Sequence, residues 1–179
     1  MLRTLMHRST RAFEARYGYD AAYLHHLVDT SIGAGLRGAL LPVLSQYRGP
    51  EPGHPVWAGA SLASVLDGDC GPCVQLVIDL ALEAGVEGDA LAACVQGAAQ
   101  QAGAVGLGFR FAEAAIRDTP DALELGARIE DVFGPHTRIA ASFAAATSRA
   151  YPVLKRALGQ GAPCIVGDLR FTPREPTAP

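Results

Sequence analysis

Residues with high helix propensity fill most of this chain, and no stretch shows the strict alternation of apolar and polar β-branched residues that is typical of a strand. Ala, Leu, Glu, Gln and Arg dominate, and Gly or Pro interrupts them at intervals of about 12 to 20 residues. Interruptions at this spacing divide a chain into separate helices. We therefore expect an all-α fold.

The chain has the size and composition of a single globular domain. It contains 179 residues, of which 49% are hydrophobic and 18% are charged, enough apolar material to build a core. Prolines and glycines concentrate in residues 48–55, which we expect to be a loop between N-terminal helices in 1–47 and a core in 56–159. The proline-rich residues 160–179 are expected to form an extended tail.

Helix-starting and helix-ending residues predict the individual helices. Gly18 ends the first, Asp20 caps the second, Pro42 kinks the second, and glycines break the chain at 103–108. Pro152 is expected to kink the last helix. The predicted helices are 2–17, 20–44, 56–66, 70–84, 90–102, 109–117, 119–133 and 136–158.

Charge and hydropathy exclude two classes of partner. The 15 Lys and Arg against 18 Asp and Glu give a net charge of -3, so no basic field exists to hold a nucleic acid. No stretch of about 18 to 20 uncharged apolar residues occurs, which argues against a membrane protein. The arginine-rich residues 1–16 faintly resemble a transit peptide, but no secretory signal follows, and we expect a cytoplasmic protein.

One motif suggests chemistry, the sequence Cys70-Gly71-Pro72-Cys73 at a predicted helix start. Two cysteines separated by two residues can close a small disulfide. The unpaired N–H groups and positive dipole of a helix start favour a thiolate there. Cys70 and Cys73 are therefore the predicted catalytic residues, whereas Cys94 and Cys164 lie far off in the sequence.

Other interpretations of this pair remain open. A structural zinc site normally needs four ligands, and neither a second Cys-x-x-Cys nor a paired histidine motif occurs, so we expect no metal and no cofactor. A second alternative is that the two cysteines are inert small apolar residues at a helix start. The same four residues occur in thioredoxin, but the apolar strand that precedes them there is absent here.

A longer likeness surrounds the motif. The run Ala63-Ser64-Val65-Leu66-Asp67-Gly68-Asp69-Cys70-Gly71-Pro72-Cys73, followed by Glu83-Ala84-Gly85-Val86, resembles the core motif of the alkylhydroperoxidase D and carboxymuconolactone decarboxylase superfamily. Residues 121–133, 136–146 and 151–159 resemble its C-terminal helices, so that the likeness spans 56–159.

This resemblance implies an alkylhydroperoxidase D-like helical bundle that forms homo-oligomers. It implies a redox couple acting on a peroxide or disulfide substrate, with a redox protein as electron donor. In that family the second cysteine attacks the peroxide and the first resolves the sulfenic acid, so Cys73 would be peroxidatic and Cys70 resolving.

The sequence departs from the family at the proton relay. The family histidine lies four residues after the second cysteine, where this chain has Val77, and the family glutamate falls in the region of Trp57-Ala58-Gly59. Three residues are candidates for replacing the relay. Asp79 lies on the same helix but about 120° away in projection, and the other two, His54 and His136, lie at a loop end and a helix start.

Without the relay, we expect Cys70 to be the more reactive thiol, because it is nearer the helix start while Cys73 faces Val77. The predicted function is a cysteine-dependent thiol–disulfide oxidoreductase or peroxidase. The alternative is a non-catalytic family member, an oligomeric small-molecule-binding or scaffold protein with a redox-sensitive disulfide. Alanine-rich residues 90–102 and 140–151 are the expected oligomer contacts.

Overall fold

The computed structural model describes residues 1–161 and 168–173, and every regular element within these two ranges is a helix. The expected all-α fold is confirmed. In chain order the elements are α1 (Leu2–Tyr17), α2 (Ala22–Thr30), α3 (Ile32–Ser45), the short 3-10 helix η1 (Glu51–Gly53), α4 (His54–Asp67), α5 (Gly71–Glu83), α6 (Gly88–Val95), the 3-10 helix η2 (Ala99–Gln101), α7 (Gly103–Ile116), α8 (Asp121–Phe133), α9 (Pro135–Thr147) and α10 (Ala150–Ala157).

Helix α4 is the centre of the core, and its residues from Val56 to Val65 are all buried. It packs most extensively against α7 and then against α9. Glycines allow this close approach: a Cβ on Gly59 would lie 1.9 Å from the Val105 carbonyl oxygen, and one on Gly108 would lie 2.0 Å from the Val56 carbonyl oxygen. The expected break at 103–108 is therefore wrong, because these residues form the first turns of α7, and Gly108 lets α7 touch α4.

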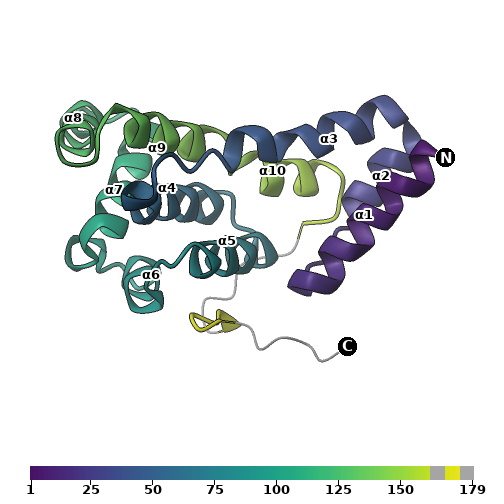
Figure 1. Ribbon diagram of the computed structural model, residues 1–179, viewed down its shortest axis with the longest axis horizontal. Helices are drawn as coiled ribbons and strands as arrows, with labels where there is room; N and C mark the ends of the chain where they lie inside the picture. Colours follow the sequence, from purple (N-terminus) through teal and green to yellow (C-terminus); the bar gives the residue numbers. More distant parts are fainter. Residues whose placement is uncertain (162–167, 174–179) are drawn as a thin grey trace.

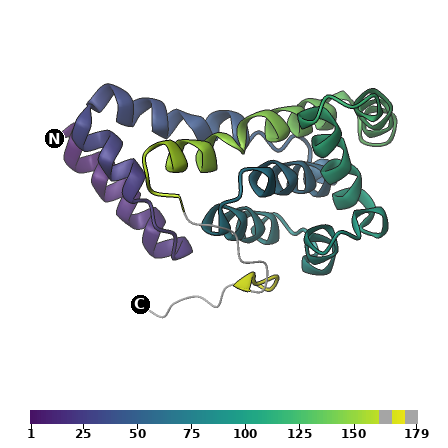
Figure 2. The same ribbon diagram turned by 180° about the vertical axis from the view of Figure 1, so that it is seen from behind.

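The N-terminal helices extend to one side of this core. Figures 1 and 2 show α1 and α2 side by side at one end of the molecule, with α3 running from there along one edge toward α9. The C-terminal end of α1 points toward the region where α4 and α5 are joined. This arrangement brings the loop between α1 and α2 to the Cys-x-x-Cys motif.

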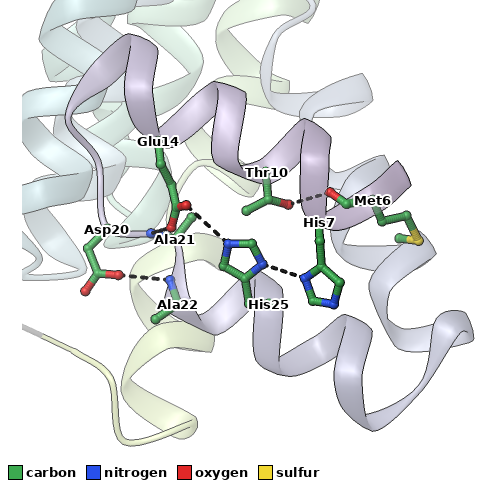
Figure 3. Close-up of polar contacts among 8 residues, drawn as sticks. All are labelled: Met6, His7, Thr10, Glu14, Asp20, Ala21, Ala22 and His25. Atoms are coloured by element: carbon green, nitrogen blue, oxygen red, sulfur yellow. Dashed lines mark hydrogen bonds and ion pairs between the residues drawn. The ribbon is translucent and has the colours of Figure 1, made fainter. Parts of the chain in front are cut away.

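A chain of polar contacts joins α1 to α2 (Figure 3). The Glu14 carboxylate accepts hydrogen bonds from the Ala21 backbone N–H at 3.1 Å and contacts His25 Nε2 at 3.2 Å. His25 Nδ1 in turn lies 2.7 Å from His7 Nδ1, with the two rings stacked. These contacts fix the geometry of the loop that contains Tyr19.

Several predicted helices are shorter than expected. The predicted helix 20–44 begins at Ala22 and breaks at Ser31. The expected cap is wrong by one residue, because Ala21 occupies the cap position, while the Asp20 carboxylate accepts a hydrogen bond from the Ala22 N–H at 2.9 Å. Ser31 is extended and its hydroxyl accepts the Ala34 N–H, so it caps a new helix, α3. Pro42 lies inside α3.

The other two breaks are simpler. The predicted helix 90–102 ends after Val95 because Gly97 takes a φ of +84°. The predicted helix 136–158 divides between Thr147 and Ala150 into α9 and α10. The expected loop 48–55 contains η1 and the first two residues of α4.

The expected tail falls largely outside the described residues, which omit 162–167 and 174–179. The described part, 168–173, lies against α5, where the Arg170 backbone N–H donates to Gln75 Oε1 at 2.8 Å. In the part of the chain that the structure describes, no helix combines the length and apolar character needed to cross a membrane.

Candidate functional site

The two cysteines of the motif lie against each other at the start of α5. Cys70 is the residue before the helix, in an extended conformation that follows a left-handed Asp69 (φ +48°). Cys73 is in the first turn, and the two Sγ atoms are 2.6 Å apart. The sulfurs are thiols, and the exposed fractions are only 2% for Cys70 and 3% for Cys73.

The turn that leads into the motif is held by the end of α9 and by α10. Asp67 forms a 2.6 Å ion pair with Arg149, and the Arg156 guanidinium donates to the Gly68 carbonyl oxygen. Cys70 occupies the cap position of α5, and the Asp67 carboxylate is engaged with Arg149.

Tyr19 from the loop after α1 reaches the inner cysteine. Its hydroxyl lies 3.6 Å from Cys73 Sγ. The hydrogen bond with Cys70 and the burial of the site raise the pKa of the Cys73 thiol above its usual value, while Tyr19 and the charge of Lys155 act in the opposite direction. Val77 is buried on the same side of α5, as the sequence predicted.

A buried lysine stands behind Tyr19. Only 2% of Lys155 is exposed, and its Nζ lies 4.7 Å from the centre of the Tyr19 ring and 5.5 Å from that of Tyr23. The ammonium group donates to the Asp20 carbonyl oxygen at 3.3 Å. Lysine is rarely buried this completely, so this placement needs a physical explanation.

Sequence reasoning missed Tyr19, Tyr23 and Lys155. They come from the first loop, α2 and α10, far in sequence from the motif, so no local spacing connects them to it. The sequence does contain one signal. Lys155 is the only lysine of the chain, and all the other Lys or Arg positions are arginines.

Asp79, the first candidate for the relay, is turned toward the C-terminal segment. It is buried, and its carboxylate accepts hydrogen bonds from Gln75 at 2.9 Å and from the Arg170 guanidinium at 2.8 Å. These contacts make Asp79 an anchor for residues 168–173. Neither of them involves a cysteine.

The two histidine candidates lie at the other end of the core. His54 begins α4, whose 14 residues span about 20 Å, and the cysteines follow the end of that helix. His136 lies near the same end of α4, because its neighbour Thr137 packs against Gly53, where an added Cβ would be only 2.2 Å from the Thr137 side chain. The Nδ1 atom of His136 lies 3.4 Å from the Tyr47 hydroxyl. The structure thus brings together Cys70 and Cys73 but none of the three predicted relay residues.

Three surface cavities lie away from the cysteines. One, of about 440 Å³, is lined by residues of α7 and α8 with Gln100, and another of about 370 Å³ lies between α7 and α9. A third, of about 130 Å³, is lined by residues that include Tyr17, Glu83 and Pro173. None of these three is lined by Cys70 or Cys73. Because both cysteines are buried, reagents reach the thiols only when the covering side chains move.

Three kinds of comparison with known proteins were made: with family models, with curated proteins and with solved structures. None of them gives a match.

Proposed function

We propose that Cys70 and Cys73 form a two-electron redox couple and that the protein is a thiol–disulfide oxidoreductase or peroxidase, a distant member of the alkylhydroperoxidase D-like superfamily acting in the cytoplasm. The 2.6 Å separation of the two sulfurs carries this proposal. A disulfide bond is about 2.05 Å long, so its formation requires a movement of about half an ångström.

The proposed reaction uses a peroxide as the oxidant and an external dithiol as the reductant. One thiolate attacks the outer peroxide oxygen, an alcohol leaves with a proton, and a sulfenic acid forms. The second thiol attacks that sulfur, releases water and closes the disulfide. An external dithiol, free or on a redox protein, then reduces the disulfide by exchange and is itself oxidised.

Cys70 is the proposed attacking thiol, and Cys73 the resolving one. This order is the reverse of the one implied by the superfamily. It is supported by the position of Cys70 at the N-cap of α5, where the unpaired N–H groups of the helix start favour a thiolate.

A second function is favoured by the burial of both cysteines. Exposed fractions of 2% and 3% leave little room for a substrate, which suits a disulfide that stabilises a non-catalytic small-molecule-binding or scaffold protein under oxidising conditions. The two functions differ in rate. An enzyme turns over peroxide with a dithiol reductant, whereas a stabilising disulfide forms once and slowly.

Peroxide consumption in the presence of a dithiol therefore tests the proposal. We expect turnover by the wild type, none by Cys70→Ser or Cys73→Ser, and unchanged turnover by Cys94→Ser, which removes a buried thiol outside the motif. Val77→His should accelerate the reaction if only the proton carrier is missing. Equal rates for the wild type and Cys70→Ser would overturn the enzymatic proposal.

We also propose that the protein forms homo-oligomers, with the contact on α3. The stretch 140–151 is unsuited to it, because Ala140, Ala141, Ala144 and Ala145 are buried within the chain. On α3, in contrast, Leu36, Leu40, Val43 and Leu44 are exposed. Light scattering tests this proposal, and a monomer of 18.7 kDa at micromolar concentration would contradict it.

A further inference from the structure

Lys155 carries a charge that the described residues do not neutralise. The ion pairs among residues 1–161 and 168–173 do not include it. Its Nζ is surrounded by the faces of Tyr19 and Tyr23 and by one backbone carbonyl oxygen. A buried ammonium group is costly unless a negative charge accompanies it, at least in the state in which the site works.

The dithiol is the group that can supply this negative charge. Tyr19 connects the two: its ring lies beneath the lysine, and its hydroxyl lies 3.6 Å from Cys73 Sγ. The tyrosines themselves are poor anions here, because burial raises the pKa of Tyr19, of Tyr23 and of Tyr151. Among the titratable groups that face Cys73, namely Cys70, the three tyrosines and Lys155, only the thiols remain as a source of the anion.

We propose that Lys155 and Tyr19 are positioning residues of the dithiol. The Lys155 ammonium group is the counter-charge for the single anion that the Cys70–Cys73 pair forms when it loses its first proton, and the Tyr19 hydroxyl donates a hydrogen bond to the Cys73 sulfur of that anion. Lys155 and Tyr19 would thus stabilise the thiolate, as a relay does, but neither would accept the thiol proton. This inference rests on the proposed redox function.

The inference predicts a change in the acidity of the dithiol. The pair should ionise at a higher pH without the lysine, by about one unit, which is about a tenfold loss of thiolate at a fixed lower pH. Because the positive charge stabilises the reduced form, its removal also makes the disulfide harder to reduce, by up to about tenfold in the exchange equilibrium with glutathione.

The test is the pH profile of alkylation of the reduced protein by iodoacetamide, resolved by site with mass spectrometry. Lys155→Met and Tyr19→Phe should move the midpoint for Cys70 and Cys73 to higher pH, and Lys155→Arg should retain the wild-type midpoint. Arg128→Met is the matched control, since it removes an exposed cation from α8 and should change nothing. If circular dichroism shows Lys155→Met to be unfolded, Lys155→Gln takes its place with the same expected shift.

A wild-type midpoint in Lys155→Met or Lys155→Gln would overturn the inference, and so would a shift in Lys155→Arg as large as that in Lys155→Met. If the alkylation midpoint of Tyr19→Phe equals that of the wild type, Tyr19 is not a positioning residue of the dithiol. Thiol acidity is measured without any substrate, so this result is separate from peroxide turnover. A protein with the expected shifts but no turnover would refute the proposed enzyme and support the charge arrangement.

Discussion

Oxidation of Cys70 and Cys73 should stabilise the protein by an amount that can be calculated from the size of the ring it closes. The bond would link residues three apart, a loop of about four residues, and the chain-entropy relation gives about 2 kcal/mol for such a loop. For a chain of this length, 1 kcal/mol corresponds to about 2 to 4 °C in Tm. We therefore expect the oxidised protein to unfold at a temperature about 4 to 8 °C higher than the reduced protein.

The difference should grow at alkaline pH. The pKa of Cys73 in the folded reduced protein is raised above the ordinary 9.0, so the unfolded chain loses this proton first. The folded state then binds more protons than the unfolded state, and its stability falls as pH rises above about 9, by at most about 1.4 kcal/mol per pH unit. A disulfide has no thiol proton to lose, so the oxidised protein does not show this fall in stability at alkaline pH.

The assay is calorimetry of the protein in oxidised and reduced glutathione at pH values on both sides of 9. Cys73→Ser is the control: it cannot form the bond, and it retains Cys70, Cys94 and Cys164, so any response it shows is due to those three thiols and not to the Cys70–Cys73 bond. The reasoning is refuted if the wild type and Cys73→Ser respond alike to oxidation, or if the difference narrows as pH rises.

Three further predictions concern the fold around the site. Burial raises the pKa of Cys94 to about 11, so Cys94→Ala should weaken the loss of stability between pH 9 and 11 in urea unfolding of the reduced protein; an unchanged slope would contradict this. Gly59→Ala should lower the free energy of unfolding by at least about 2 kcal/mol, because its Cβ would lie 1.9 Å from the Val105 carbonyl oxygen. Gly33→Ala is the comparison: its Cβ would have no neighbour nearer than 3.4 Å, so it should stabilise α3 by up to about 1 kcal/mol. Similar unfolding midpoints for the two variants would refute the close α4–α7 contact. His25→Ala breaks the contacts with Glu14 and His7 and should cost about 1 kcal/mol, with faster amide exchange confined to α1 and α2; protection equal to wild type would mean that the chain of contacts does not hold this hairpin.

Local signals sufficed where a single residue decides a helix end. Gly18 ends α1 in the left-handed conformation, as predicted, and the Cys-Gly-Pro-Cys sequence starts α5 where expected. The missed break at Ser31 has a different cause. A serine within a helical run is a weak signal, because the same hydroxyl can bond within a helix or cap a new one. Packing against the rest of the protein decides between the two.

Glycines show the same limit. At Gly97 the glycine breaks a helix, whereas at Gly106 and Gly108 it allows a helix to approach other backbone, and the sequence alone does not distinguish these uses. The cysteine pair was predictable because its spacing is local. Tyr19 and Lys155 were not, since only the folded chain brings the first loop and α10 to the start of α5.

A buried lysine and a histidine relay have different consequences for pH dependence. A histidine changes its charge near neutral pH, so a relay built on it makes thiol reactivity vary there. A lysine ammonium group favours the thiolate by its positive charge and does not carry the proton away. Val77 lies on α5 four residues after Cys73, and Lys155 belongs to α10. We therefore expect the alkylation rate to follow one ionisation, that of the dithiol. A second step in the profile between about pH 6 and 7 would mean that a histidine acts on the pair, contrary to the positions of His54 and His136 at the far end of α4.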